Sequence, residues 1–280
     1  MTSNSGVLYI VATPIGNLSD ISERAKQILD SVASIAAEDT RHTGRLLQHL
    51  GITNKLVSLH DHNERQKASY FVDKLLKGDD IALVSDAGTP LISDPGYFLV
   101  REVRAAGLKV VPIPGACALV AALSASGLAT DRFVFEGFLP AKSTARQKQL
   151  ELLNNEARTM VFYESTHRIA HSLKDMSAIF GEQRLATVAR ELTKTFETIH
   201  SDSLGNLIQW MQQDRDQQRG EFVVIVSGNL NSLTSEESES DRIVDILSTK
   251  LPLAQATSLA AEITGERKKG LYQRALQRRD

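Results

Sequence analysis

Short β-branched runs alternate with amphipathic helical windows through the first 113 residues, and this alternation constrains the fold more than any other feature of the sequence. The run Ile81–Val84 is apolar throughout, as is typical of a strand buried on both faces. Such alternation predicts a mainly parallel sheet covered by helices, an α/β fold. The expected strands are Val7–Ala12, Ser34–Ala37, Leu56–Leu59, Ile81–Val84 and Lys109–Pro112.

Helix boundaries follow from capping residues. Asp20 with Glu23 resembles a capping box at the start of the first helix. Gly51 is expected to end the helix that begins near Thr40 as a left-handed cap. Asp94-Pro95 reads as an N-cap followed by proline at the first helical position, so a helix is expected from there to Gly107.

At 280 residues the chain exceeds the ~250 at which one core usually stops growing, so more than one domain is expected. Pro112 and Pro114 mark the junction. Further strands are expected at Phe133–Glu136, Thr159–Tyr163, Leu185–Ala189 and Phe222–Val226, and helices at Gly115–Gly127, Thr144–Leu153, Thr166–Phe180 and Leu204–Met211. The predicted domains are α/β units at 1–113 and 114–230, a Ser/Glu-rich linker at 231–240 and a helical module at 241–280.

The helical module is basic at its end. Residues 266–280 hold six Lys or Arg against two Asp or Glu, a net charge of +4. The formal net charge of the whole chain is −2, so residues 1–265 carry a net charge of −6. Three short helices with a tight turn at Gly265 resemble a helix-turn-helix, in which Lys268 and Lys269 would contact nucleic acid. An ordinary solvated helix face explains the same charges.

Composition restricts the compartment and the site chemistry. The single cysteine, Cys117, excludes an intrachain disulfide and a cysteine-based zinc site. The lack of disulfides fits a protein of a reducing compartment. The apolar run at the N-terminus lacks the pattern of a secretory signal, and the longest charge-free apolar stretch, 116–130, is shorter than the ~20 residues that span a bilayer. We therefore expect a cytoplasmic protein.

Two glycine-bearing turns follow predicted strands, at 13–17 and 85–90. At the carboxyl ends of strands in an open α/β sheet, such turns let the backbone approach a ligand. Neither turn contains the glycine pattern of a dinucleotide or P-loop site. Taken singly, each also fits an ordinary strand-to-helix loop.

The segment 85–96, Ser-Asp-Ala-Gly-Thr-Pro-Leu-Ile-Ser-Asp-Pro-Gly, holds more turn residues and acids than a plain turn needs. It resembles the ribosomal RNA small subunit methyltransferase I branch of the class III, tetrapyrrole-methylase-like, S-adenosylmethionine-dependent methyltransferases. Further segments in family order are similar as well, at 8–18, 37–41, 62–64, 112–115, 136–140, 162–168, 189–194 and 220–223. The resemblance covers essentially the whole chain.

The resemblance implies two α/β domains with S-adenosyl-L-methionine in the cleft between them, a homodimer, and 2′-O-methylation of a cytidine in the decoding region of small-subunit (16S) ribosomal RNA. The partner would be that RNA or the assembled subunit. The positions that match cofactor contacts are Pro14, Gly88, Thr89, Ile92, Cys117, Ala118, Tyr163, Ala189, Arg190 and Glu221.

Methyl transfer to a ribose hydroxyl requires a base or a group that stabilises the alkoxide. Glu191 is our candidate for the proton acceptor and Lys194 for the stabilising cation, with Asp86 as an alternative base or cofactor ligand. A surface ion pair accounts equally for the first two, and a loop cap for Asp86. Candidate RNA contacts in the first domain are Asn17, Arg41, His42, His62, Asn63 and Glu64.

The sequence raises the question of a metal site and leaves two alternative functions open. Histidines at 60 and 62, and at 167 and 171, resemble metal ligands, but no zincin motif is complete and methyl transfer needs no Lewis acid, so no metal is expected. A tetrapyrrole C-methylase would share the fold, although a glycine-rich first loop is expected there. A non-catalytic ribosome-binding or RNA-binding protein would keep the fold without the cofactor.

Overall fold

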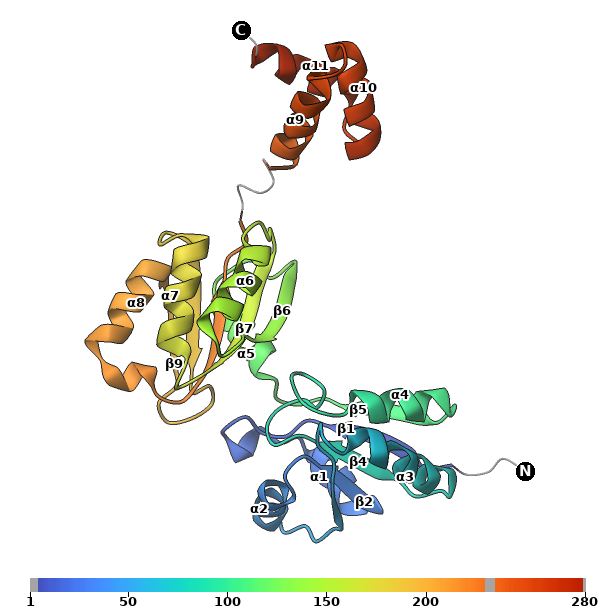
Figure 1. Cartoon of the computed structure of the whole chain (residues 1–280). Helices are drawn as coiled ribbons and strands as arrows, with labels where there is room; N and C mark the ends of the chain where they lie inside the picture. Colours follow the sequence, from blue (N-terminus) through green and yellow to red (C-terminus); the bar gives the residue numbers. More distant parts are fainter. Residues whose placement is uncertain (1–4, 230–234, 279–280) are drawn as a thin grey trace.

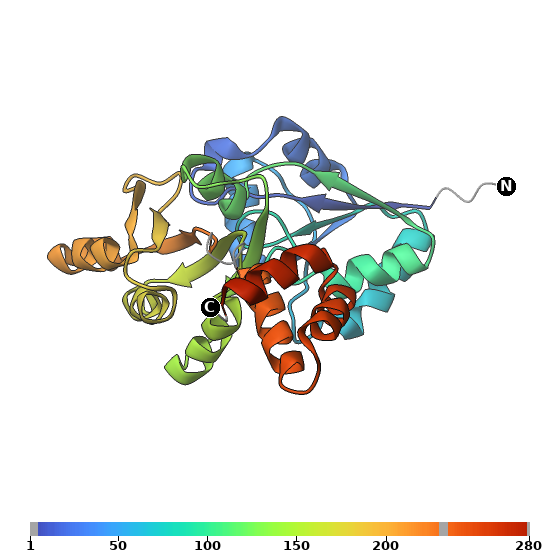
Figure 2. The ribbon, with the colours of Figure 1, turned by 90° about the horizontal axis from the view of Figure 1, so that it is seen from above.

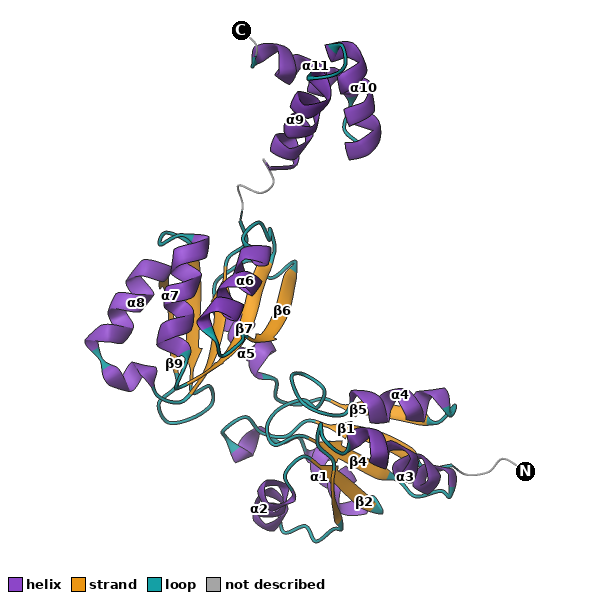
Figure 3. Ribbon diagram, viewed as in Figure 1, coloured by secondary structure: helices purple, strands orange, loops and turns teal. Residues whose placement is uncertain are grey.

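The computed structural model of the chain describes residues 5–229 and 235–278 and contains two five-stranded sheets and a group of three helices (Figure 1). Helices cover both faces of each sheet (Figure 3). Within the described residues, no helix is long and apolar enough to cross a membrane.

The first sheet has the order β3-β2-β4-β1-β5, and every neighbouring pair is parallel. The parallel sheet predicted from the alternating pattern is therefore confirmed, with strand ends that differ by one residue. The strands are β1 (Val7–Val11), β2 (Ser34–Ala37), β3 (Leu56–Ser58), β4 (Ile81–Val84) and β5 (Lys109–Ile113).

Two helices cover each face of this sheet. Val11 and Ala82 face α1 (Glu23–Ser31) and α2 (Thr40–Leu50). Leu8 and Leu83 face α3 (Glu64–Leu76) and α4 (Tyr97–Ala105). The chain therefore leaves β1 and β4, which are neighbours, toward opposite faces, and the loops beyond them separate at the carboxyl edge. Ligands of open α/β sheets bind at this kind of switch point.

Two predicted helix starts are wrong. Asp20 lies in a short 3-10 turn (Leu18–Asp20), and Ser22 caps α1 by accepting a hydrogen bond from the amide of Ala25 at 3.1 Å. Asp94-Pro95 does not open α4, which begins at Tyr97. The Glu64 carboxylate accepts a hydrogen bond from the amide of Leu99 at 2.9 Å, so a buried side chain from α3 caps α4 in place of a local one.

The second sheet has the order β6-β7-β10-β8-β9, in which only β6 and β7 are parallel. Its strands are β6 (Phe133–Phe138), β7 (Thr159–Ser165), β8 (Leu185–Arg190), β9 (Thr198–Ser203) and β10 (Glu221–Val226). One face packs against α5 (Ala118–Ala125), the other against α6 (Ser143–Leu153), α7 (Ile169–Phe180) and α8 (Leu204–Gln213), which is followed by a 3-10 turn (Arg215–Gln218). The edge strand β9 was not predicted, because its sequence, Thr-Ile-His-Ser-Asp-Ser, has one strongly apolar residue.

Three helices follow: α9 (Ser235–Ser248), α10 (Leu253–Thr264) and α11 (Lys268–Gln277). They pack around Val244, Ala260 and Leu271, and Gly265 ends α10 in the left-handed conformation, as predicted. The predicted linker 231–240 is too long, since α9 begins at Ser235. Serine and glutamate suit the first turn of a helix, so this composition is compatible with a helix start as well as with a linker.

Candidate active site

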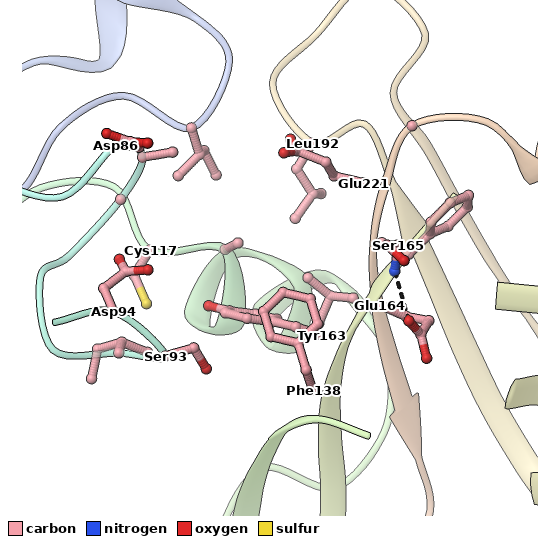
Figure 4. A pocket seen from close by; sticks show the side chains of 18 of the residues that line it. Asp86, Ser93, Asp94, Cys117, Phe138, Tyr163, Glu164, Ser165, Leu192 and Glu221 are labelled. Atoms are coloured by element: carbon pink, nitrogen blue, oxygen red, sulfur yellow. Dashed lines mark hydrogen bonds between the residues drawn. The ribbon is translucent and has the colours of Figure 1, made fainter. Parts of the chain in front are cut away.

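A cavity of about 440 Å³ lies between the loops of the first sheet and the strand ends of the second (Figure 4). The first sheet contributes the loops after β1, β2, β4 and β5, and the second sheet contributes the end of β6 and residues in or next to β7, β8 and β10. Its apolar lining includes Ile15, Ile92, Phe138, Leu192 and Val223. The volume falls in the range of ligand pockets, roughly 300–1,000 Å³.

Backbone pairing at the switch point fixes the two loops that form one wall. The amide of Thr13 donates to the carbonyl of Gly88 at 2.9 Å, and the amide of Gly88 donates to the carbonyl of Thr13 at 3.1 Å. The Thr89 hydroxyl donates to the carbonyl of Ala116 at 3.0 Å and ties the loop to the chain entering α5. The wall is therefore rigid before any ligand arrives.

A second cavity, of about 410 Å³, adjoins the first. Ile15, Asp86, Ala87 and Glu221 line both, so the two spaces share a wall. The second space is lined by Arg45, Lys194 and His42 together with the carboxylates of Asp86 and Glu221, and Lys194 Nζ pairs with Glu221 at 2.7 Å. One cleft therefore joins a space with apolar lining to one that holds basic side chains.

The loop after β1 touches the loop after β8 beside this second cavity. A Cβ atom on Gly16 would lie 2.5 Å from Cγ of Lys194 and 3.1 Å from the backbone oxygen of Leu192. Any side chain at this position would push the loops apart, so glycine is required for the close approach. The contact holds Lys194 at the edge of the cavity.

Backbone strain is concentrated in the loops around the cleft. Among the described residues, the non-glycine residues with positive φ are Leu91, Ser93, Glu191 and Thr193. The first two lie in the loop after β4 and the other two in the loop after β8. Such conformations cost ~1–3 kcal/mol each and cluster at functional sites, because the surrounding structure must impose them.

Three carboxylates face one another beside the first cavity. Burial, with repulsion from Glu38 and Asp86, raises the pKa of Asp94 to about 6, although a hydrogen bond from Ser85 opposes the shift. Burial, with repulsion from Asp86, also raises the pKa of Glu38. The cavity therefore holds concentrated negative charge that a cationic ligand would relieve.

Eight of the ten predicted cofactor residues line the first cavity, at positions 88, 89, 92, 117, 118, 163, 189 and 221. Pro14 lines the second cavity instead. Arg190 lines neither, because its guanidinium is turned away and donates to the carbonyls of Arg219 at 2.7 Å and Phe196 at 3.0 Å. Its role in the structure is to hold the loop after β8.

The predicted catalytic residues are divided. Asp86 lines both cavities, and Lys194 lines the second. Glu191 lines neither: its Oε1 atom accepts hydrogen bonds from Lys194 Nζ at 2.8 Å and from the amide of Glu221 at 2.9 Å. Partial burial alone would raise the pKa of Glu191. The two hydrogen bonds and the charge of Lys194 outweigh it, so the pKa of Glu191 is lowered and the carboxylate is a weaker base.

The predicted RNA contacts also separate into groups. His42 lines the second cavity, Arg41 is exposed and pairs with Asp39 at 2.9 Å, and Asn17 caps a turn by accepting from the amide of Ser19. His62 is exposed beside this edge, and Lys268 and Lys269 are exposed in the first turn of α11.

Asn63 and Glu64 were assigned to RNA from sequence, and the structure gives both a structural role. The Asn63 side chain accepts from the amide of His60 at 3.0 Å, which closes a turn. Glu64 is 3% exposed and caps α4, so substrate cannot reach it. Sequence reasoning also missed two lining residues, Phe138 at the end of β6 and Leu192 in the loop after β8, because their positions depend on how the second sheet pairs.

Two adjoining cavities at the switch point of an α/β sheet have room for two ligands side by side, as an enzyme that transfers a group between two substrates requires. The family described as Tetrapyrrole (Corrin/Porphyrin) Methylases matches residues 7–208, and the RsmI C-terminal HTH domain matches residues 234–279. The chain belongs to the tetrapyrrole methylase family, in its ribosomal RNA small subunit methyltransferase I branch.

The relatives that place it there match along their whole length. Ribosomal RNA small subunit methyltransferase I of Pseudomonas aeruginosa is 56% identical over 98% of this chain and 98% of that protein. The protein of the same name from Escherichia coli O157:H7 is 54% identical over 98% of this chain and 96% of its own length. The chain is therefore an enzyme, a methyltransferase, and its methyl donor is S-adenosylmethionine.

Solved structures agree on the fold alone. The methyltransferase CobJ superposes with a TM-score of 0.58 at 19% identity, over 80% of this chain and 95% of that one. Diphthine synthase superposes with a TM-score of 0.58 at 15% identity, over 79% and 90%. Both assignments made from the sequence, the family and the two-unit α/β architecture, are confirmed.

The first cavity fits the donor by its chemistry. S-adenosylmethionine carries a sulfonium and an ammonium group, and the carboxylates of Glu38, Asp86 and Asp94 supply the opposite charge. The apolar lining, with Tyr163 and Phe138 5.6 Å apart edge to face, suits a flat heterocycle. No group of three or more potential metal ligands occurs in the described part of the chain.

Binding of the donor should depend on the charge of Asp94. Below pH 6 its carboxyl is protonated, so the cavity loses a negative charge and S-adenosylmethionine should bind more weakly as the pH falls from 7 to 5. The loss should reach up to about tenfold for each unit by which the complex lowers this pKa. Calorimetric titration across this range measures it.

Asp94→Asn should bind weakly with a flatter pH profile. Glu38→Gln, run in parallel, separates the second titrating carboxyl, and exposed Asp131→Asn should reproduce the wild-type profile. An unaltered pH profile in Asp94→Asn would remove this residue from donor binding.

Proposed function

We propose that the enzyme methylates the 2′-hydroxyl of a cytidine in the decoding region of small-subunit (16S) ribosomal RNA. The observation that carries the proposal is the second cavity, which places the basic side chains of Arg45, Lys194 and His42 next to the donor cavity and shares Asp86 with it. A nucleotide bound there would bring its phosphate to the cations and its sugar to the shared wall.

A tetrapyrrole substrate is the second candidate, since the family is named for it and uroporphyrin-III-C-methyltransferase of Thermus thermophilus superposes with a TM-score of 0.54 at 18% identity. Two features favour RNA. The first loop is Thr-Pro-Ile-Gly-Asn without a glycine-rich pattern, and the chain carries the C-terminal helical module of its closely related ribosomal RNA methyltransferases.

The residues divide the work by position. S-adenosylmethionine, when bound, would supply an electrophilic methyl group: the bond from the 2′-oxygen to that carbon would form as the carbon–sulfur bond breaks, S-adenosylhomocysteine would leave with the electron pair, and the hydroxyl would give up its proton. Asp86, on the shared wall, accepts that proton, and the Lys194 ammonium stabilises negative charge on the oxygen. Glu191 orients Lys194 through their 2.8 Å hydrogen bond. In this proposal Asp86, which lines both cavities, is the base in place of Glu191, which lines neither.

The remaining expectations belong to the proposal as well. The domain limit at 113/114 is supported by β5 ending at Ile113 and by α5 packing on the second sheet. The homodimer follows from the resemblance. A cytoplasmic location fits an enzyme whose substrate is ribosomal.

Purified enzyme with radiolabelled S-adenosylmethionine should label small ribosomal subunits or their RNA at the 2′-oxygen of one cytidine, found by nuclease digestion and mass spectrometry. Uroporphyrinogen III should remain unlabelled. Donor binding without transfer to either RNA form would contradict the proposal, and labelling of the tetrapyrrole would establish the alternative.

Substitutions test the assigned roles in single turnover. Asp86→Asn and Lys194→Ala should each slow methyl transfer by about 10²-fold or more, because a base and a charge-stabilising group are removed. Glu191→Gln should cost less than about tenfold, since glutamine can still accept the bonds that orient Lys194.

Exposed Asp131→Asn and Lys109→Ala serve as matched controls for charge and should leave the rate unchanged. A large loss in Glu191→Gln with a small one in Asp86→Asn would return the role of base to Glu191.

Part of the basic charge of the C-terminal module is used internally. Arg274 pairs with Asp241 at 3.0 Å and with Glu266 at 2.7 Å, and Arg278 also pairs with Asp241. Lys268 and Lys269 are exposed at the start of α11, where the helix dipole also favours phosphate. We propose this helix start as the RNA-binding part of the module.

Lys268→Ala/Lys269→Ala should weaken RNA binding and lower the slope of log K against log salt by about 0.7–0.9 for each phosphate that the variant no longer neutralises. Filter binding at several salt concentrations measures the slope. Lys148→Ala/Lys174→Ala, two exposed lysines on α6 and α7, is the matched control. Equal slopes in the two double variants would make the helix start structural.

A further inference from the structure

An exposed group of aromatic and cationic side chains lies at the starts of α3 and α4, outside both cavities. We call Arg65, Tyr97, Phe98 and Arg101 the aromatic platform. The Arg65 guanidinium lies 4.2 Å from the centre of the Phe98 ring, and that of Arg101 lies 5.1 Å from Phe98 and 5.8 Å from Tyr97. Tyr97 is 61% exposed.

Buried contacts hold the platform in place. The hydrogen bond from the Leu99 amide to the Glu64 carboxylate joins the start of α4 to the start of α3. Arg65 follows Glu64 and Phe98 precedes Leu99, so this bond fixes the backbone next to both platform residues. The helices lie side by side in both views (Figures 1 and 2). Side chains on such a support are presented in one arrangement at little entropic cost.

The platform lies at the same edge of the sheet as the cleft. Both helices begin at the carboxyl ends of parallel strands, and Tyr97 follows Asp94, a lining residue of the donor cavity, by three positions. A chain that leaves the cleft along this edge can therefore reach the platform.

The chemistry of the platform selects one class of partner. An exposed tyrosine ring and guanidinium planes stack on unpaired bases, and the arginine charges attract phosphate. Glu102 pairs with Arg101 at 2.8 Å, but Arg65 and Arg104 add exposed positive charge nearby, against a body that is acidic as a whole. A basic aromatic surface fits a single-stranded nucleic acid better than an acidic or aliphatic partner.

We propose that the aromatic platform binds an unpaired stretch of the substrate RNA that flanks the target nucleotide, with a base stacked on Tyr97 and phosphates at Arg65 and Arg101. The proposal rests on the proposed function. It adds a site for neighbouring nucleotides that lies apart from the residues of methyl transfer.

Equilibrium binding of the full chain to two labelled probes tests it: an oligocytidylate, and an abasic oligonucleotide of equal length that keeps the phosphates. Tyr97→Ala should raise the Kd for oligocytidylate about fivefold or more and leave the abasic probe unchanged. Arg65→Ala should weaken both probes and lower the salt slope by about 0.7. Tyr70→Ala, an exposed tyrosine on α3, and Arg24→Ala, an exposed arginine on α1 at the opposite face of the sheet, are matched controls.

Equal losses of Tyr97→Ala on both probes, or no loss, would overturn the stacking site. A change in sedimentation of Tyr97→Ala with unchanged RNA binding would make the surface an interface between copies of the chain and overturn the proposal. Methyl transfer by the wild-type enzyme, measured separately, distinguishes either failure from failure of the proposed function itself.

Discussion

The two hydrogen bonds between Thr13 and Gly88 are the interaction on which the cleft depends. They join loops that leave neighbouring parallel strands toward opposite faces of the sheet, at the point where a crevice forms for topological reasons. Both cavities are lined by residues next to this bridge: Ile15 and Ala87 belong to each. Paired backbone fixes the two loops to each other, and the Thr89 hydroxyl adds a bond to Ala116, which leaves side chains such as Ile15 and Ile92 to line the cavity.

The second sheet completes the cleft with a different device. The loop after β8 carries Glu191 and Thr193 in strained conformations, and Arg190, Glu191 and the turn at Gly220 hold it through hydrogen bonds to backbone and to Lys194. Strain in one loop is therefore offset by fixed polar contacts around it. The outcome is a lysine whose ammonium is placed by two carboxylates and by the contact of its stem with Gly16. Since this contact crosses between the two units, the second cavity forms only when both units are folded.

The sequence was sufficient for the features that depend on local pattern. Buried strands such as Ile81–Val84 and the left-handed cap at Gly51 follow from residue type and spacing, and the family segments located most of the donor cavity. It was insufficient where distant residues decide. Glu64 looked like a substrate contact because it is charged and follows a polar loop, yet its partner is an amide 35 positions away. Glu191 is predicted from its spacing to Lys194, but the spacing does not show that its carboxylate also accepts a hydrogen bond from the amide of Glu221, 30 positions away. The polar edge strand β9 gains its conformation from pairing with β8, and its sequence lacks the alternation of apolar and polar residues that would predict a strand.

Charge placement shows why a nearly neutral protein can work on a polyanion. The net charge of −2 averages an acidic body with a basic end, and the structure divides it further. Carboxylates gather in the donor cavity, where a cationic ligand offsets their repulsion, whereas Lys194, Arg45 and the platform arginines lie outside it. Because charges separated by more than ~10 Å are screened at physiological salt, an RNA chain responds to these local clusters rather than to the sum. Asp86 and Glu221 also line the second cavity, where Arg45, Lys194 and His42 offset their charge. The carboxylates of Glu38 and Asp94 line the donor cavity alone, so one cleft can attract a positive donor there and a negative acceptor at the basic side chains.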